Sequence, residues 1–135
     1  MGLKPEDFES APPHPASVAA FYAWIHLAKG RPWIEAVASC SALEVRNSAA
    51  IVRGGGLSGR IRKKLIEEVG LPAEELINQE RHVVADEEHA DLMKELVERY
   101  VHTELDQRMV LRGVRETFLI DRAFRGGLAA GMAAL

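Results

Sequence analysis

The chain has 135 residues, of which 47% are hydrophobic and 27% charged, with a formal net charge of −3 and one cysteine. This composition is typical of one globular domain, and the acidic balance argues against nucleic-acid binding, which normally needs a basic excess. A lone cysteine excludes an internal disulfide, no apolar run approaches the ~20 residues of a membrane span, and the N-terminus lacks a signal-peptide core, so we expect a cytoplasmic protein.

Helical periodicity runs through the chain and strand patterns are absent, which predicts a single all-α domain, an antiparallel bundle of five or six helices. Prolines predict an irregular lead-in over residues 1–15. Residues 126–135, GGLAAGMAAL, are expected to form a fraying tail. Between the lead-in and the tail, proline and glycine residues mark the expected helix boundaries, and Ser58 is the expected N-cap of the third helix. Helices are expected over about residues 16–29, 32–52, 59–69, 78–100 and 103–124, with a turn after Pro72.

Three metal-type side chains, His82, Asp86 and His89, share one face of the helix expected over 78–100. Offsets of 4 and 7 residues return to nearly the same azimuth at roughly 100° per residue. The same face continues with the apolar residues Met93, Leu96 and Tyr100. Burying two imidazoles and a carboxylate is costly unless a partner compensates them, so we expect the three to point inward and bind a metal ion. The alternative is that they hydrogen-bond to one another in the core.

A second stripe lies on the helix expected over 32–52, and it contains Trp33, Val37, Cys40, Glu44 and Ile51. This pattern places Glu44 inside an apolar seam and makes Cys40 a small core residue. Bundle di-iron sites combine lone carboxylates with (Glu/Asp)-x-x-His motifs, which Glu44 and Asp86-x-x-His89 match. The mixed oxygen and nitrogen ligands favour iron or manganese over a metal that prefers thiolates.

Two other patterns are given structural interpretations. The glycines of segment 53–64 lack the Gly-Lys-Ser/Thr spacing of a phosphate-binding loop, so an interhelical loop is favoured. The arginines of the last helix alternate with acids, which is typical of a solvated face. Acidic residues opposite the histidine stripe, Glu87 and Glu88 among them, are also expected to face solvent.

The His82-x3-Asp86-x2-His89 pattern, with Glu44 on an earlier helix, resembles the heme-oxygenase-like helical bundle family. That family includes pyrroloquinoline-quinone synthase and the TENA/THI-4 proteins, and the resemblance is to its iron-containing branch of di-metal oxidases. The stretches Trp33-Ile-Glu-Ala and Asp121-Arg-Ala-Phe124 look similar to core helices of the quinone synthase. The resemblance covers only the C-terminal portion of the family fold, without the leading helices that donate a further Glu and His.

The resemblance implies an iron-dependent oxidoreductase in which Glu44, His82, Asp86 and His89 hold a metal that activates dioxygen against a small organic substrate. It also implies that a homodimer, or a partner chain supplying the missing helices, completes the site. One alternative is a non-catalytic helical protein that binds a ligand or partner through the family's pocket. Another is a thiaminase-like hydrolase that depends on Cys40.

Overall fold

The computed structural model describes residues 4, 6, 9 and 11–134, and this part of the chain contains helices but no strand. The all-α prediction is therefore confirmed for the described residues. None of the described helices is long and apolar enough to span a membrane. The helices are α2 (Pro15–Gly30), α3 (Trp33–Asn47), α4 (Leu57–Glu67), the 3-10 helix η1 (Ala73–Glu75), α5 (Ile77–Tyr100) and α6 (Glu104–Ala133).

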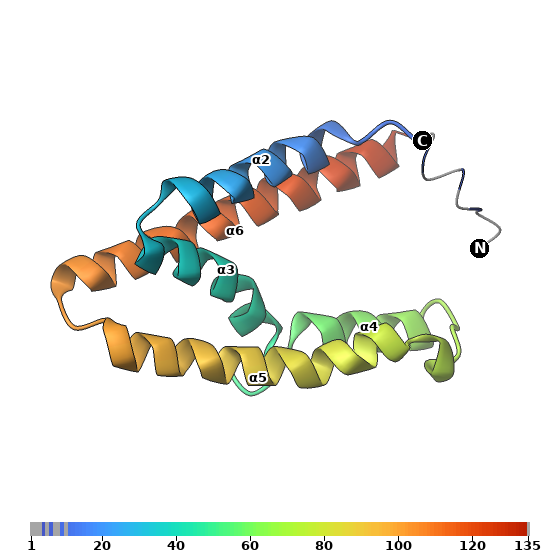
Figure 1. The fold of residues 1–135 in the computed structure, drawn as a ribbon. Coiled ribbons are helices and arrows are strands. Elements are labelled where there is room, and N and C mark those ends of the chain that lie inside the picture. The colour runs from blue at the N-terminus through green and yellow to red at the C-terminus, as the bar shows by residue number, and fades with distance from the viewer. Residues whose placement is uncertain (1–3, 5, 7–8, 10, 135) are drawn as a thin grey trace.

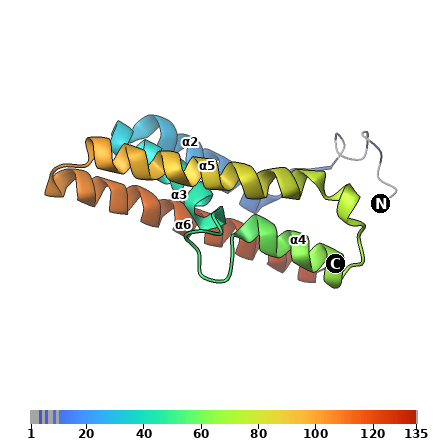
Figure 2. The same cartoon turned by 90° about the horizontal axis from the view of Figure 1, so that it is seen from below.

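The helices form two arms joined at one end (Figure 1). One arm pairs α2 with the C-terminal half of α6, the other pairs α4 with α5, and α3 lies between them (Figures 1 and 2). Helices α2 and α5 run opposite to α6, as expected of an antiparallel bundle, but α3 runs in the same general direction as α6. Because α3 packs on both α5 and α6, it is the element that connects the two arms.

Helix α3 ends at Asn47, five residues before the predicted end at Val52. Residues 48–56 form a loop in which Gly54 and Gly55 have positive φ angles of 90° and 93°. The helix stops because the next backbone N–H groups, of Ala49 and Ala50, donate to a carboxylate of α5. A tertiary contact therefore ends this helix, and the sequence periodicity does not reveal it.

Two other boundaries also differ from the predictions. Gly56, not Ser58, is the N-cap of α4, so Ser58 lies in the first turn and its hydroxyl is available to another helix. The expected tail is helical to Ala133 because it packs on α2, where a Cβ added to Gly127 would lie 2.5 Å from the Ala16 Cβ.

The lead-in predicted over residues 1–15 is described only in part. Residues 12–14 have no regular structure, whereas Glu6 and Glu9 have helical conformation, so the described part is not irregular throughout. Residues 1–3, 5, 7–8 and 10 lie outside the described residues.

The buried face of α3 is not the predicted one. Trp33 is 55% exposed and Cys40 is exposed, so the prediction that they belong to the core is wrong. The buried residues are Ile34, Glu35, Ala38, Ser39 and Ala42. Small side chains on this face let α6 approach closely, and the Thr117 hydroxyl donates to the Ser39 carbonyl over 3.0 Å. The approach leaves no space at Gly113, where an added Cβ would lie 2.5 Å from the Glu35 carbonyl oxygen.

Ion pairs reinforce the packing of α6. The Glu35 carboxylate is 1% exposed and accepts hydrogen bonds from Arg112, whose Nε lies 2.9 Å away. This bond raises the pKa of Arg112. Asp121 accepts from both Arg46, at 2.5 Å, and Arg125, at 3.0 Å. The arginines of α6 are exposed, as predicted, but Arg112 and Arg125 also pair with buried carboxylates.

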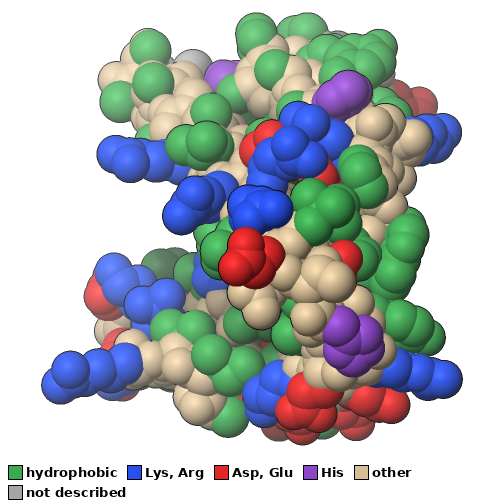
Figure 3. All heavy atoms as spheres, turned by 90° about the vertical axis from the view of Figure 1, so that its left-hand side faces the viewer, with side chains coloured by type: hydrophobic (Ala, Val, Ile, Leu, Met, Phe, Trp, Pro, Cys, Tyr) green, Lys and Arg blue, Asp and Glu red, His purple; other side chains and the backbone are tan. Residues whose placement is uncertain are grey.

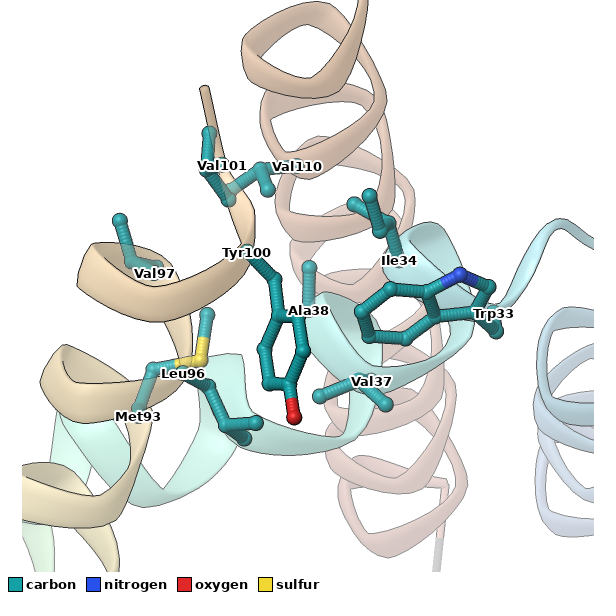
Figure 4. Close-up of a pocket in the computed structure, with 10 residues that line it drawn as sticks. All are labelled: Trp33, Ile34, Val37, Ala38, Met93, Leu96, Val97, Tyr100, Val101 and Val110. Carbon is teal, nitrogen blue, oxygen red and sulfur yellow. The ribbon is translucent and has the colours of Figure 1, made fainter. Parts of the chain in front are cut away.

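A small apolar pocket lies where α3, α5 and the start of α6 meet (Figure 4). The rings of Trp33 and Tyr100 pack edge to face there, with centroids 5.3 Å apart. The cavity is about 20 Å³, room for about one water molecule and too small for an organic substrate. We therefore regard it as part of the hydrophobic packing.

Candidate metal centre

The last turn of α3 meets the middle of α5 at Glu44 and His89. The His89 Nδ1 lies 3.1 Å from the Glu44 Oε2, with the two side chains 50% and 38% exposed. The helices are antiparallel here, since Asn47 further along α3 meets Asp86 earlier on α5. Glu44 is thus at the edge of the helix interface, where its carboxylate still contacts water, and not inside an apolar seam.

Asp86 is the buried member of the predicted set, with 1% of its surface exposed. Its Oδ2 accepts a hydrogen bond of 2.8 Å from the Ser58 hydroxyl of α4. Its Oδ1 has only a long contact of 3.5 Å with the Asn47 Nδ2 of α3. The Asp86 carboxylate of α5 therefore contacts two other helices, α3 and α4, and its Oδ1 is the oxygen with spare capacity to accept.

Glu44, Asp86 and His89 each offer one ligand atom such that all three atoms lie within 4.8 Å of one another. Two ligands bound side by side on one ion at about 2.1 Å are about 3 Å apart, close to the Glu44–His89 separation. Small side-chain rotations would bring Asp86 to the same ion. The described residues thus fit a site with two carboxylate oxygens and one imidazole nitrogen.

The neighbouring Asn47 gives a further sign that the site suits a cation. Its Oδ1 is buried without a hydrogen-bond partner, while its Nδ2 faces Asp86. Since amide oxygen and nitrogen positions can be exchanged by a flip, an ion beside Asp86 could accept this oxygen as a further ligand. Carboxylate, imidazole and amide oxygen together are typical ligands for iron or manganese.

His82 lies outside this group of three. Its side chain is 57% exposed, and its Nδ1 is 3.9 Å from the Asp86 Oδ1, beyond hydrogen-bond distance. The expectation that the whole stripe points inward is correct for Asp86 and wrong for His82 and His89, which are both exposed. The buried residues of α5 are Asp86, Ala90 and Met93, a narrower arc than the predicted stripe.

Glu87, which was predicted to face solvent, instead accepts three hydrogen bonds from the end of α3 and the loop after it. The donors are the Ser48 hydroxyl at 2.6 Å and the backbone N–H groups of Ala49, at 2.5 Å, and Ala50, at 3.2 Å. These bonds, led by the one from Ser48, lower the pKa of Glu87. Nothing in the spacing of α5 could have identified this residue, because its partners come from a loop.

A larger pocket of about 550 Å³ lies between α3, α5 and α6. It begins one helical turn along α5 from His89, at Met93, and its lining residues Ala42 and Val45 on α3 lie on either side of Glu44 in sequence. Figure 3 shows the surface hollowed between the half that contains α2 and α6 and the half that contains α4 and α5. The aromatic residues Tyr22 and Trp24 of α2 do not line this pocket, because Tyr22 is 65% exposed and Trp24 packs on Phe124.

Comparisons with protein families, curated proteins and solved structures gave no match to this chain. The resemblance to the heme-oxygenase-like bundles therefore stays a prediction.

Proposed function

We propose that the junction of α3 and α5 is a metal centre and that the chain is an iron-dependent oxidoreductase acting on a small organic substrate. The observation that carries the metal site is the convergence of Glu44, Asp86 and His89, with ligand atoms within 4.8 Å of one another. His82, one turn before Asp86, becomes a fourth ligand by rotation of its exposed side chain. The reaction class comes from the resemblance of the His-x3-Asp-x2-His pattern, and bound iron would supply the redox chemistry for dioxygen.

The chain's own residues prepare this site in distinct ways. Ser58 orients Asp86 by donating to its Oδ2, which leaves Oδ1 available. The His89 Nδ1 faces the Glu44 carboxylate, so a proton on this nitrogen must leave before the nitrogen binds a metal.

Exposure of Glu44 and His89 leaves room for a further ligand source. A second copy of the chain, or another polypeptide, would approach from the solvent side of these residues. This is the arrangement that we propose for a second metal ion, since one chain has too few candidate ligands to hold two.

The test is metal analysis of protein purified from iron-supplemented medium, with the variants Glu44→Gln and His89→Gln. Glu88→Gln is the matched control, because Glu88 is an exposed carboxylate directly beside His89. We expect about one equivalent of iron in the wild type and in Glu88→Gln, and loss of the metal in the other two. Ser58→Ala should weaken metal binding by about 10- to 100-fold, the usual effect of removing a residue that orients a ligand.

A folded wild-type chain that takes up no iron or manganese would refute the metal centre. Stoichiometric iron without dioxygen consumption over a panel of small organic acids and amines would leave the metal site standing and refute the oxidase.

A second candidate function is non-catalytic binding of a small molecule. The apolar pocket of about 550 Å³ favours it, because pockets of about 300–1,000 Å³ are typical of ligand sites. Binding of a ligand to metal-free protein would support this function.

A further inference from the structure

The pocket between α3, α5 and α6 is apolar over most of its wall. Helix α3 contributes Ala42 and Val45, α5 contributes Met93 and Val97, and α6 contributes Val114 and Phe118. Aliphatic and aromatic walls of this kind bind the apolar body of a ligand but do not orient it. The orientation must come from a polar group on the wall.

Arg46 is that group. It lines the pocket, its side chain is 19% exposed, and its Nε is buried with no hydrogen-bond partner. Because this Nε has almost no accessible surface, a ligand would meet the accessible part of the Arg46 side chain, where the charge of the guanidinium attracts an anion.

The charge around Arg46 favours an anion. Asp121 is shared by Arg46 and Arg125, so two guanidinium groups have one carboxylate between them. At the rim on α5, the charge of Lys94 is compensated by Asp91 at 2.7 Å, so Glu98 leaves a net negative charge there. The positive excess therefore lies at the Arg46 end of the pocket.

We infer that this pocket binds a small organic molecule with an apolar body and a single carboxylate, which pairs with the Arg46 guanidinium. The inference rests on the second candidate function and deepens it by naming the class of ligand. It does not depend on the metal, because the pocket is formed without Glu44, Asp86 or His89.

The test uses three probes of equal length, octanoate, 1-octanol and octylammonium, titrated into chelator-treated protein and followed by calorimetry. We expect octanoate to bind at one equivalent and about tenfold or more tighter than octanol, because a charge-assisted hydrogen bond to Arg46 is gained. Octylammonium should bind more weakly than octanol. Chemical shifts of isotope-labelled protein should change at Val97, Val114 and Phe118.

Two variants locate the binding. Arg46→Lys keeps the charge beside Asp121 but replaces the guanidinium fork with a single ammonium, and it should weaken octanoate binding about tenfold while leaving octanol unchanged. Arg62→Lys is the matched control, since the Arg62 Nε is also buried without a partner but lies on α4 outside the pocket. Val114→Trp should abolish binding by filling the pocket, whereas Leu119→Trp, an exposed position on the same helix, should not.

Equal affinity for octanoate and octanol in the wild type would overturn the proposal, whether or not the variants fold. Shift changes confined to residues outside the pocket would overturn it as well. Because all titrations use metal-free protein, failure to load iron would count against the metal centre alone.

Discussion

Asp86 and Glu87 are consecutive residues of α5, and each accepts hydrogen bonds from a different part of the chain. Asp86 is held by α4 through Ser58, whereas Glu87 is held by the end of α3 and the loop after it. A helix turns by about 100° per residue, so neighbours point in different directions and can anchor different elements. The proposed metal ligand Asp86 and the loop anchor Glu87 are thus adjacent in sequence but serve separate contacts.

Replacement of Glu87 by Gln should destabilise the protein at neutral pH, because the charged acceptor of three hydrogen bonds is lost. The pKa of Glu87 is lowered in the folded state, so its carboxylate stabilises the fold above the ordinary value of 4.5. This contribution is lost as pH falls through the lowered pKa. The difference in the free energy of unfolding between wild type and Glu87→Gln should therefore be largest near pH 7 and shrink as the pH falls below 4.5.

Urea unfolding at pH 7, 5, 4 and 3 measures this difference. Glu88→Gln is the control, since Glu88 is exposed and should show little effect at any of these values. A constant difference for Glu87→Gln across the range would contradict the role of its charge.

Among the contacts between helices, the crossing of α3 and α6 is the one that determines how α3 packs in the fold. Small residues on both helices bring the backbones together, and the pair between buried Glu35 and exposed Arg112 lies beside the closest approach at Gly113. Trp33 and Cys40 of the predicted seam on α3 are exposed because the small-residue face allows the closer packing. Small side chains, by letting the two backbones approach, thus select the buried face of α3.

Gly113→Ala should lower stability by about 1–3 kcal/mol, because the new methyl group would meet the Glu35 backbone oxygen at 2.5 Å and force the helices apart. Gly126→Ala on the same helix is the matched control, since nothing lies within 4 Å of an added Cβ there. That variant should be neutral or stabilising by about 0.5–1 kcal/mol, because alanine favours a helix over glycine. Thermal unfolding of both variants tests this prediction, and equal destabilisation by the two substitutions would contradict the close approach of α3 and α6 at Gly113.

At the scale of the whole molecule, the two arms leave large apolar side chains on the surface. Phe21 is 59% exposed, Tyr22 65% and Trp33 55%, and the first two lie side by side on α2 with their rings 5.7 Å apart. Exposed patches of this kind often mark an interaction surface. A second copy packed on the same patch about a two-fold axis would cover it in both chains.

We therefore expect a homodimer in sedimentation experiments at micromolar concentration. Tyr22→Glu should shift the equilibrium strongly toward monomer, because two-fold symmetry places two carboxylates in one apolar interface. Val69→Glu, at another exposed apolar position outside α2, should leave the assembly unchanged. A wild-type chain that sediments as a folded monomer would contradict the prediction.

The sequence by itself determined the helical class and the approximate span of most helices, because hydrophobic periodicity and the positions of proline and glycine depend on local properties. It also identified Asp86 and His89 as neighbours, since side chains three residues apart on a helix share a face, but it expected Glu44 inside an apolar seam, whereas the structure places it at the edge of the helix interface. Only the tertiary structure decided which face of α3 is buried, that α6 continues to Ala133, and that Glu87 anchors a loop. These features depend on contacts between segments 37 to 111 residues apart, as between Glu87 and Ala50 or Gly127 and Ala16, and periodicity along one helix carries no information about its partner.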